Sequence, residues 1–273
     1  MDRAKGKIAI VTGATWVEAG GLDIGGAVAS ALAAEGAKVV LADIKIEAAQ
    51  ALADRLNEEH GDKTAIAVYA DIRDEAQIEA LVREAVSTFG GLNVVINNAG
   101  IFPPNDGPIA SMEVEVWDNV FATNLRGAML VSKHAMPHLE ENGGSIINTS
   151  STHAFAGDTA LSAYGATKAA LIALTKYTAT QHGKKGVRAN AICPGTTTTP
   201  PAQQLPQAIK DVYTEHTLNP AMNSPERLAQ VFLFLASDES LGINGEIIRV
   251  DGGLLSHQPF VPDMNRLMMT TVG

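Results

Sequence analysis

Short apolar runs, many of them rich in β-branched residues, alternate along the chain with longer segments that repeat apolar positions at helical spacing. Most of the runs are apolar at successive positions, which is typical of parallel strands that helices cover on both faces. Seven strands are predicted, at Lys7–Thr12, Lys38–Asp43, Thr64–Tyr69, Leu92–Asn97, Ser145–Ser150, Val187–Cys193 and Glu246–Val250. Helices are predicted between them, at Ile24–Glu35, Ile46–Glu59, Asp74–Phe89, Val114–Leu139, Leu161–His182 and Pro225–Ala236.

This alternation predicts an α/β fold with one doubly wound parallel sheet of seven strands and helices on both faces. No linker or repeat interrupts the pattern, so a single domain is expected over residues 1–273. Residues 200–222, rich in Pro and Gln, break the rhythm and are predicted to form a substrate lid. Residues 254–273 form a C-terminal tail, whose Phe and Met content favours docking on an apolar surface, such as a neighbouring subunit.

Composition narrows the possible classes of protein. The 30 acidic and 20 basic side chains give a net charge of −10, which argues against nucleic acid or an anionic membrane as a partner. No apolar stretch is long enough for a membrane span and no signal-peptide core follows the N-terminus, so a cytoplasmic location is expected. The single cysteine, Cys193, excludes a disulfide framework and a multi-cysteine zinc site, and its apolar run predicts a buried strand residue; no metal is expected.

The first predicted βαβ unit carries the features of a dinucleotide site. Gly13 follows the first strand, and Asp23, Ile24 and Gly25 open the next helix. Glycines let the backbone approach a pyrophosphate, and the helix N-terminus supplies free N–H groups. Asp43 ends the second strand, where a carboxylate accepts hydrogen bonds from ribose hydroxyls and repels a 2′-phosphate. The unit therefore predicts a Rossmann-type site for NAD rather than NADP.

A second set of polar residues points to proton transfer. Tyr164 and Lys168 lie four positions apart in a predicted helix, so their side chains share one face. A phenol has a pKa of about 10, and a neighbouring ammonium is expected to lower the pKa of Tyr164 toward neutrality. Tyr164 can then act as a general acid or base on a carbonyl or hydroxyl oxygen.

These residues belong to a wider pattern that includes the Asn97-Asn98-Ala99-Gly100 turn, Ser151, Tyr164-x-x-x-Lys168, Pro194-Gly195 and Val250-Asp251-Gly252-Gly253. With this pattern the chain resembles the short-chain dehydrogenase/reductase family over nearly its whole length. The resemblance implies an NAD(H)-dependent alcohol dehydrogenase or carbonyl reductase that interconverts a secondary alcohol and a ketone. It implies that Tyr164 exchanges the proton, Lys168 binds the nicotinamide ribose, Ser151 hydrogen-bonds the reacting oxygen and Asn124 holds a relay water.

By the same resemblance, the cofactor is expected to contact residues at the strand ends. These are Gly13, Asp23, Ile24, Gly25, Asp43, Ile44, Asp71, Ile72, Asn98, Ala99, Gly100, Tyr164, Lys168, Pro194, Gly195, Thr197 and Thr199. Ser151, His153 and Tyr164 are the candidate contacts to a small-molecule substrate. The long segments Val114–Leu139 and Leu161–His182 resemble helices that pair between subunits, which implies a homo-oligomer, either a dimer or a tetramer.

The chain departs from the family pattern in its first loop. Nine residues separate Gly13 from Asp23, where the family usually has three between its first two glycines. Asp23 replaces the second glycine, and we expect it to cap the helix. Enoyl-type C=C reductases of the same superfamily also have a long first loop. In their pattern six residues separate Tyr from Lys, whereas three separate Tyr164 from Lys168 here, so a C=O substrate is favoured. A catalytically inactive NAD-binding regulatory or scaffold protein stays as the alternative outside enzymes.

Overall fold

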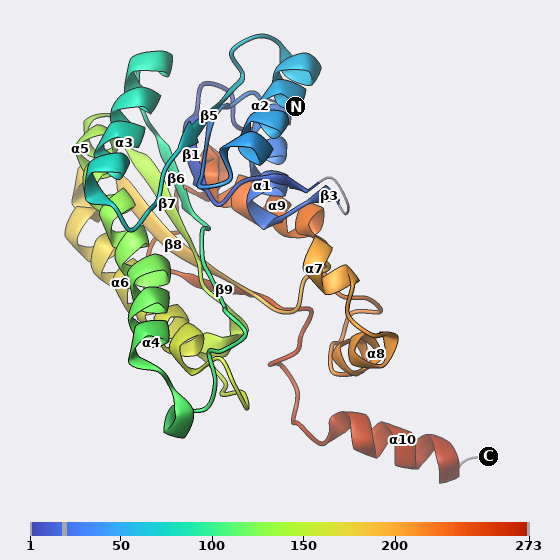
Figure 1. Ribbon diagram of the computed structural model, residues 1–273. Coiled ribbons are helices and arrows are strands. Elements are labelled where there is room, and N and C mark those ends of the chain that lie inside the picture. Colours follow the sequence, from blue (N-terminus) through green and yellow to red (C-terminus); the bar gives the residue numbers. More distant parts are fainter. Residues whose placement is uncertain (1, 18–20, 272–273) are drawn as a thin grey trace.

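The computed structural model describes residues 2–17 and 21–271, and within them it contains a seven-stranded parallel sheet (Figure 1). The strands are β1 (Ile8–Thr12), β4 (Lys38–Asp43), β5 (Ala65–Tyr69), β6 (Val94–Asn97), β7 (Gly144–Thr149), β8 (Val187–Pro194) and β9 (Ile247–Val250). Their order in the sheet is β5-β4-β1-β6-β7-β8-β9. The predicted α/β fold is confirmed.

The order of strands reverses beside β1. From β1 the chain adds β4 and β5 on one side, and then returns to add β6 to β9 on the other. Ile10 of β1 therefore pairs with Val40 of β4 and with Val95 of β6. In an open parallel sheet, such a switch point leaves a crevice at the carboxyl ends of the strands, where ligands bind.

Helices cover both faces of this sheet (Figure 1). The first face packs against α1 (Ile24–Ala34), α2 (Ile46–His60) and α9 (Pro225–Ala236). The second packs against α3 (Glu75–Phe89), α5 (Ala128–Asn142) and α6 (Ser162–His182). Successive residues of β1 point to opposite faces of the sheet, so Ile10 lies in one apolar core and Val11 in the other.

The segment expected as one helix over Val114–Leu139 has three parts. They are α4 (Val114–Phe121), the π-helical turn η2 (Ala122–Gly127) and α5. A π-turn inserts an extra residue into the helical hydrogen-bond ladder and is common at functional sites. The turn contains Asn124, one of the expected site residues, and its side chain is buried.

The insertion after Gly13 forms a small hairpin that the sequence did not predict. Strands β2 (Trp16–Val17) and β3 (Gly21–Leu22) pair antiparallel, and residues 18–20 between them lie outside the described residues. The Arg55 guanidinium of α2 lies 4.5 Å from the centroid of a Trp16 ring. The hairpin therefore leans on α2 beside the mouth of the crevice, held by a cation–π contact.

The segments predicted as a lid and a C-terminal tail contain helices. Residues 200–222 contain α7 (Pro200–Gln203) and α8 (Gln207–Glu215), and the tail contains α10 (Val261–Thr271), with residues 272–273 outside the description. In Figure 1, α10 projects from the body below α8. An ion pair of 3.1 Å between Arg266 and Glu215 links these two helices. The remaining short turns are η1 (Ile109–Ser111), η3 (Thr152–Ala154), η4 (Gly183–Lys185) and η5 (Asp238–Ser240).

In the part of the chain that the structure describes, none of the helices combines the length and the hydropathy that crossing a membrane requires.

Candidate active site

The glycine loop and the start of α1 meet in backbone contact. Gly13 follows β1 with a φ of +67°, a conformation that side chains other than glycine rarely adopt. A Cβ atom placed on Gly25 would lie 2.0 Å from the Gly13 carbonyl oxygen, so only glycine fits there. The two glycines thus form a cradle at the helix N-terminus, which matches what a dinucleotide pyrophosphate needs.

Asp23 caps α1, as expected from its position. One of its carboxylate oxygens accepts a hydrogen bond of 2.6 Å from the Gly26 N–H, and the other accepts one of 2.7 Å from the Thr15 hydroxyl. Burial raises the pKa of Asp23, while the hydrogen bonds from Thr15 and Gly26 oppose that shift. The carboxylate is therefore turned onto the helix and the inserted loop.

A cleft of about 480 Å³ runs along the carboxyl ends of β1, β4 and β6. Most of the expected cofactor residues line it, namely Gly13, Asp23, Ile24, Asp43, Ile44, Asp71, Ile72, Asn98, Ala99, Gly100 and Thr199. Gly25, Pro194, Gly195, Thr197, Tyr164 and Lys168 lie outside that lining. Of these, Thr197 is buried and its hydroxyl donates to the Gly195 carbonyl over 3.1 Å.

Asp43 and Asp71 occupy different surroundings within the cleft. Asp43 accepts a 2.8 Å hydrogen bond from the Lys45 backbone N–H at the end of β4. The Asp71 carboxylate instead pairs with Arg73, the closest approach being 2.6 Å, and this hydrogen bonding lowers the pKa of Asp71. The Arg73 guanidinium also donates to Asn119 over 2.9 Å.

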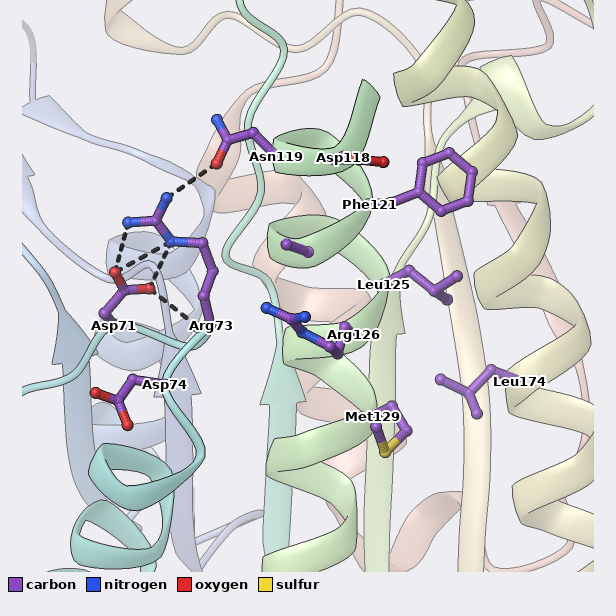
Figure 2. Close-up of a pocket in the computed structure, with 11 residues that line it drawn as sticks. Asp71, Arg73, Asp74, Asp118, Asn119, Phe121, Leu125, Arg126, Met129 and Leu174 are labelled. Carbon is purple, nitrogen blue, oxygen red and sulfur yellow. Dashed lines mark hydrogen bonds and ion pairs between the residues drawn. The ribbon is translucent and has the colours of Figure 1, made fainter. Parts of the chain in front are cut away.

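The Asp71–Arg73–Asn119 cluster separates the cleft from a second hollow of about 1050 Å³ (Figure 2). Away from that cluster, Figure 2 shows apolar side chains of the α4–η2–α5 segment and of α6, with Phe121, Leu125, Met129 and Leu174 around the hollow. This hollow lies on the outer face of the helices, and Asp71, Arg73 and Asn119 border both the hollow and the cleft.

The turn after β6, residues 98–101, is held by hydrogen bonds on both sides. On one side, the Asn98 amide donates to the Gly13 carbonyl over 2.8 Å. On the other, Asn124 accepts a 2.7 Å bond from the Ile101 N–H and donates one of 2.9 Å to the Ile101 carbonyl. Asn124 also reaches the Thr167 hydroxyl of α6 over 3.3 Å. The side chain expected to hold a water thus ties this turn to α6.

Ser151, Tyr164 and Lys168 come together beyond the end of β7. The Lys168 ammonium lies 5.3 Å from the centroid of the Tyr164 ring, and it donates a 2.7 Å hydrogen bond to the Thr149 carbonyl. Ser151 and Lys168 are 6% and 4% exposed. Burial lowers the pKa of Lys168 from 10.5 to about 8, because a desolvated ammonium is disfavoured.

The pKa of Tyr164 is raised, opposite to the expected direction. Burial is the main cause, a hydrogen bond from Ser151 acts to lower the pKa, and Cys193 adds a smaller upward contribution. The expectation counted only the attraction between the phenolate and the Lys168 ammonium. The same enclosure removes water from both groups, so it penalises both charges.

Sequence reasoning missed Asp106, a buried carboxylate that is 1% exposed. Its two oxygens each accept a 2.9 Å hydrogen bond, from the N–H groups of Ala163 and Tyr164. Leu161 starts α6 with a φ of +62° and provides no side-chain cap. Asp106 therefore caps the helix that carries Tyr164 from a loop more than fifty positions earlier, a distance at which no local sequence signal exists.

His153 lies between Ser151 and a second missed carboxylate, Asp158. Its Nδ1 is 3.2 Å from the Ser151 hydroxyl oxygen, and its Nε2 is 3.2 Å from Asp158. The rings of His153 and Phe102 approach the Tyr164 ring edge-on, with centroids 5.5 and 5.8 Å away. Two aromatic rings therefore border the phenol, and both ring nitrogens of His153 already have partners.

The remaining candidates for site chemistry are metal ligands and the single cysteine. Across residues 2–17 and 21–271, no three His, Cys, Asp or Glu side chains are grouped to hold a metal ion. Cys193 lies in β8 and is fully buried, as expected.

Comparisons with known proteins agree with this geometry. The family model described as enoyl-(acyl carrier protein) reductase matches residues 20–255. A probable short-chain type dehydrogenase/reductase of Bradyrhizobium diazoefficiens is 39% identical, over 96% of this chain and 92% of the relative. Meso-2,3-butanediol dehydrogenase of Serratia marcescens is 36% identical, over 92% and 95% of the two chains. The 7alpha-hydroxysteroid dehydrogenase of Bacteroides fragilis is 34% identical, over 96% and 99%.

Proposed function

Since the chain belongs to the short-chain dehydrogenase/reductase family, we propose that it interconverts a secondary alcohol and a ketone with NAD(H), and that Tyr164 exchanges the proton. Relatives named as dehydrogenases of a diol and of a hydroxysteroid support alcohol and ketone oxidoreduction as the general class. The finer assignment rests on the site itself.

The buried cluster of Ser151, Tyr164 and Lys168 is the observation that carries the proposal. A phenol with the Ser151 hydroxyl as a hydrogen-bonding neighbour and the Lys168 ammonium 5.3 Å from its ring is equipped to take or give a proton. Ser151 stands within hydrogen-bonding reach of the same phenol, where a donor can stabilise negative charge on a reacting oxygen. A bound nicotinamide dinucleotide would supply or accept the hydride.

The residues of the cleft fit such a cofactor. The glycine cradle at Gly13 and Gly25 leaves the N-terminus of α1 open to phosphate, and the 480 Å³ cleft extends from there past Asp43. Lys168 would hold the nicotinamide ribose, and Asn124 would keep the turn after β6 in place. We assign NAD rather than NADP because the Asp43 carboxylate would repel a 2′-phosphate.

The cofactor preference is tested by comparing kcat/KM with NADH and NADPH. We expect NADH to be preferred by roughly tenfold or more, since one lost or repelled charge contact is worth at least 1.4 kcal/mol. Asp43→Ala should shrink that preference, while Asp74→Ala, which removes the N-cap carboxylate of α3 outside the lining of the cleft, should not. Equal or better kcat/KM with NADPH in the wild-type protein would contradict the assignment of NAD as the cofactor.

The activity is tested with a defined panel. We would measure NADH formation from meso-2,3-butanediol, cyclohexanol and a 7α-hydroxysteroid, NADH consumption with the matching ketones, and NADH binding by fluorescence. Turnover of at least one alcohol and ketone pair supports the proposal. Binding without turnover would instead support a regulatory or scaffold protein.

A trans-2-enoyl thioester belongs in the same panel, because the matched family model carries an enoyl reductase description. Only three residues separate Tyr164 from Lys168, which favours the C=O reaction. Faster NADH consumption with the enoyl thioester than with any ketone would reverse that choice.

We also propose that the chain forms a homo-oligomer through the outer face of α4, α5 and α6. The hollow of Figure 2 lies on this face and is lined by Phe121, Leu125 and Leu174 together with Met129, which is 37% exposed. A second copy would bury these apolar groups. Light scattering tests this directly, and a monomeric mass would overturn it.

A further inference from the structure

Four side chains form a continuous line from the proposed reaction site to the surface. The His153 and Tyr164 rings meet edge-on with centroids 5.5 Å apart, and the Ser151 hydroxyl is the hydrogen-bonding group that acts to lower the pKa of the Tyr164 phenol. His153 Nδ1 lies 3.2 Å from the Ser151 hydroxyl oxygen, and His153 Nε2 lies 3.2 Å from Asp158. Exposure increases along the line, since Ser151 is 6% exposed while the side chains of His153 and Asp158 are 28% and 49% exposed.

Donor and acceptor capacity fixes the direction of these bonds. The N–H of Thr159 and then the His153 ring lower the pKa of Asp158, so this group is a carboxylate and only accepts. Nε2 of His153 must therefore carry a hydrogen toward it. Nδ1 then accepts when the ring is neutral and donates when the ring is charged.

The Ser151 hydroxyl responds to that difference. It already accepts a 3.2 Å hydrogen bond from the His153 backbone N–H, which leaves one lone pair and one hydrogen. A neutral His153 ring draws the hydroxyl hydrogen to Nδ1. A charged ring donates to the hydroxyl oxygen instead, and the hydroxyl hydrogen is then directed to Tyr164 or to a reacting oxygen.

We propose that His153 is a proton reservoir for Tyr164, reached through the Ser151 hydroxyl and oriented by Asp158. The inference rests on the proposed function, because it requires Tyr164 to exchange a proton with substrate. His153 acts through Ser151, so it is a positioning and relay residue rather than one that touches substrate.

The proton balance closes in both directions. In alcohol oxidation, the Tyr164 phenolate takes the substrate hydroxyl proton and passes a proton to Ser151, which gives its own to Nδ1 of neutral His153. The charged ring then loses one proton to solvent and returns to the neutral form that carries its hydrogen on Nε2, ready for the next turnover. In ketone reduction, charged His153 supplies the proton that restores Tyr164, and every bond made and broken is reversed.

The groups around His153 support this assignment. Its ionisable contacts are Asp158 on its own loop and Tyr164 on α6, with Lys168 behind the Tyr164 ring and Asp106 at the start of α6. The line from Tyr164 to Asp158 includes neither Lys168 nor Asn124, whose polar groups bond to Thr149 and Ile101. It is thus separate from the relay that the family resemblance implies.

The first test needs no substrate. With 15N-labelled histidine, the ring nitrogens of His153 are identified as the signals missing from His153→Gln. We expect neutral His153 to carry its hydrogen on Nε2, and Asp158→Asn to reduce the population of that tautomer. A neutral ring protonated on Nδ1 would overturn the proposal, since it could neither donate to Asp158 nor accept from Ser151.

The second test is kinetic and uses the panel member that the wild-type protein turns over fastest. We expect His153→Gln to lower kcat roughly tenfold with little change in KM, and to increase the solvent deuterium isotope effect on kcat. In His153→Ala, added imidazole should restore much of the lost turnover. Asp158→Asn should fall between the wild-type protein and His153→Gln.

His134→Gln is the matched control, because His134 also pairs with a carboxylate, Glu75, but bonds to no site hydroxyl. Its kinetics should equal those of the wild-type protein. Unchanged kcat and isotope effect in His153→Gln, with an active wild-type protein, would overturn the reservoir alone. A lowered kcat in His153→Ala that imidazole fails to raise would also overturn it, and a wild-type protein inactive on the whole panel would overturn the proposed function.

Discussion

Two regions of the molecule, which we call the floor and the rim, are built in opposite ways. The floor consists of Asn124, Ser151, Tyr164 and Lys168 and is largely closed to water. Its Asn124 amide donates to the Ile101 carbonyl, and its Lys168 ammonium donates to the Thr149 carbonyl. The rim consists of residues 200–222 and 254–271. Its helix α8 contains no buried residue, and Phe260 of the tail is 58% exposed.

This difference separates chemistry from selection. Groups that exchange a proton gain from burial, because low dielectric strengthens their mutual interactions and changes their pKa values. Groups that select a substrate have to open and close around it, so they are drawn from parts with few buried contacts. We therefore expect changes in the floor to act on kcat and changes in the rim to act on KM.

The largest effect is expected from Tyr164→Phe. Removing the phenol hydroxyl should lower kcat about 100- to 10,000-fold, the usual contribution of a general acid or base, while NADH affinity stays nearly unchanged. Steady-state kinetics and NADH fluorescence titration measure the two quantities. Tyr177→Phe on the same helix is the control, since Tyr177 is 67% exposed and should keep wild-type kinetics. Near-normal turnover in Tyr164→Phe would place the proton exchange elsewhere.

The next effect concerns pH and stability. Lys168 has a folded pKa of about 8 against an ordinary 10.5, so above pH 8 the unfolded chain binds a proton that the folded protein lacks. Its contribution to the free energy of unfolding therefore rises with pH from about 8 to 10.5, by at most about 3 kcal/mol.

Urea unfolding at a series of pH values checks this sign. Lys168→Met should lack the rise, so the wild-type protein should gain stability relative to the variant as the pH increases. Lys176→Met, at an exposed position of the same helix, should follow the wild-type curve. A difference between the wild-type protein and Lys168→Met that is constant with pH would contradict a strongly lowered pKa for Lys168.

A smaller effect is expected at the cap of α6. Asp106→Ala leaves the N–H groups of Ala163 and Tyr164 without their acceptor, and a lost N-terminal cap costs about 1–2 kcal/mol. Because Tyr164 shifts with the first helical turn, kcat should also fall roughly tenfold. Asp106→Asn keeps one acceptor oxygen and should lose less of both. If Asp106→Ala loses stability with no loss of kcat, the cap does not position Tyr164.

The smallest effect is expected from ending the chain after Gln258, which removes α10 but keeps His257. The KM of the alcohol should increase by roughly 2- to 5-fold with kcat unchanged, since the Arg266–Glu215 pair that ties the tail to the lid is an exposed one worth little. Arg266→Gln removes this pair, together with the Arg266–Asp263 pair inside α10, but keeps the helix, and it should give part of the increase. A fall in kcat comparable to that of Tyr164→Phe would show that the tail contributes to the floor.

Sequence patterns predicted the floor better than the rim for physical reasons. All seven strands were found because runs such as residues 39–42 and 94–96 are apolar at successive positions, which few other structures require. The Tyr164–Lys168 contact followed from helix periodicity. The hairpin at Trp16 was missed because its two-residue strands lie in a loop insertion and are too short for a hydrophobic pattern. The π-turn around Asn124 was missed because an extra residue in a helix leaves its hydrophobic pattern largely intact.

Other features depended on partners that are distant in sequence or on the exclusion of water. Asp106 and Asp158 are ordinary loop carboxylates in the sequence, and only the fold brings them to Tyr164 and His153. The expected lowering of the Tyr164 pKa was wrong because the prediction considered the attraction to the Lys168 ammonium and left out the burial of the phenol. The roles assigned to the site residues stay predictions until the experiments above are done.

The position of Asp106 has a consequence for the order in which the protein folds. A helix normally nucleates with a cap from its own flanking residues, whereas α6 receives its cap from a loop 57 positions earlier. Closing a chain segment of that length has to precede the last hydrogen bonds of the first turn, and such non-local contacts form late. The nascent chain would therefore acquire most of its sheet and the body of α6 before Tyr164 is fixed. Catalytic competence would then appear as a separate, later phase than the burial of the core, even within this single domain.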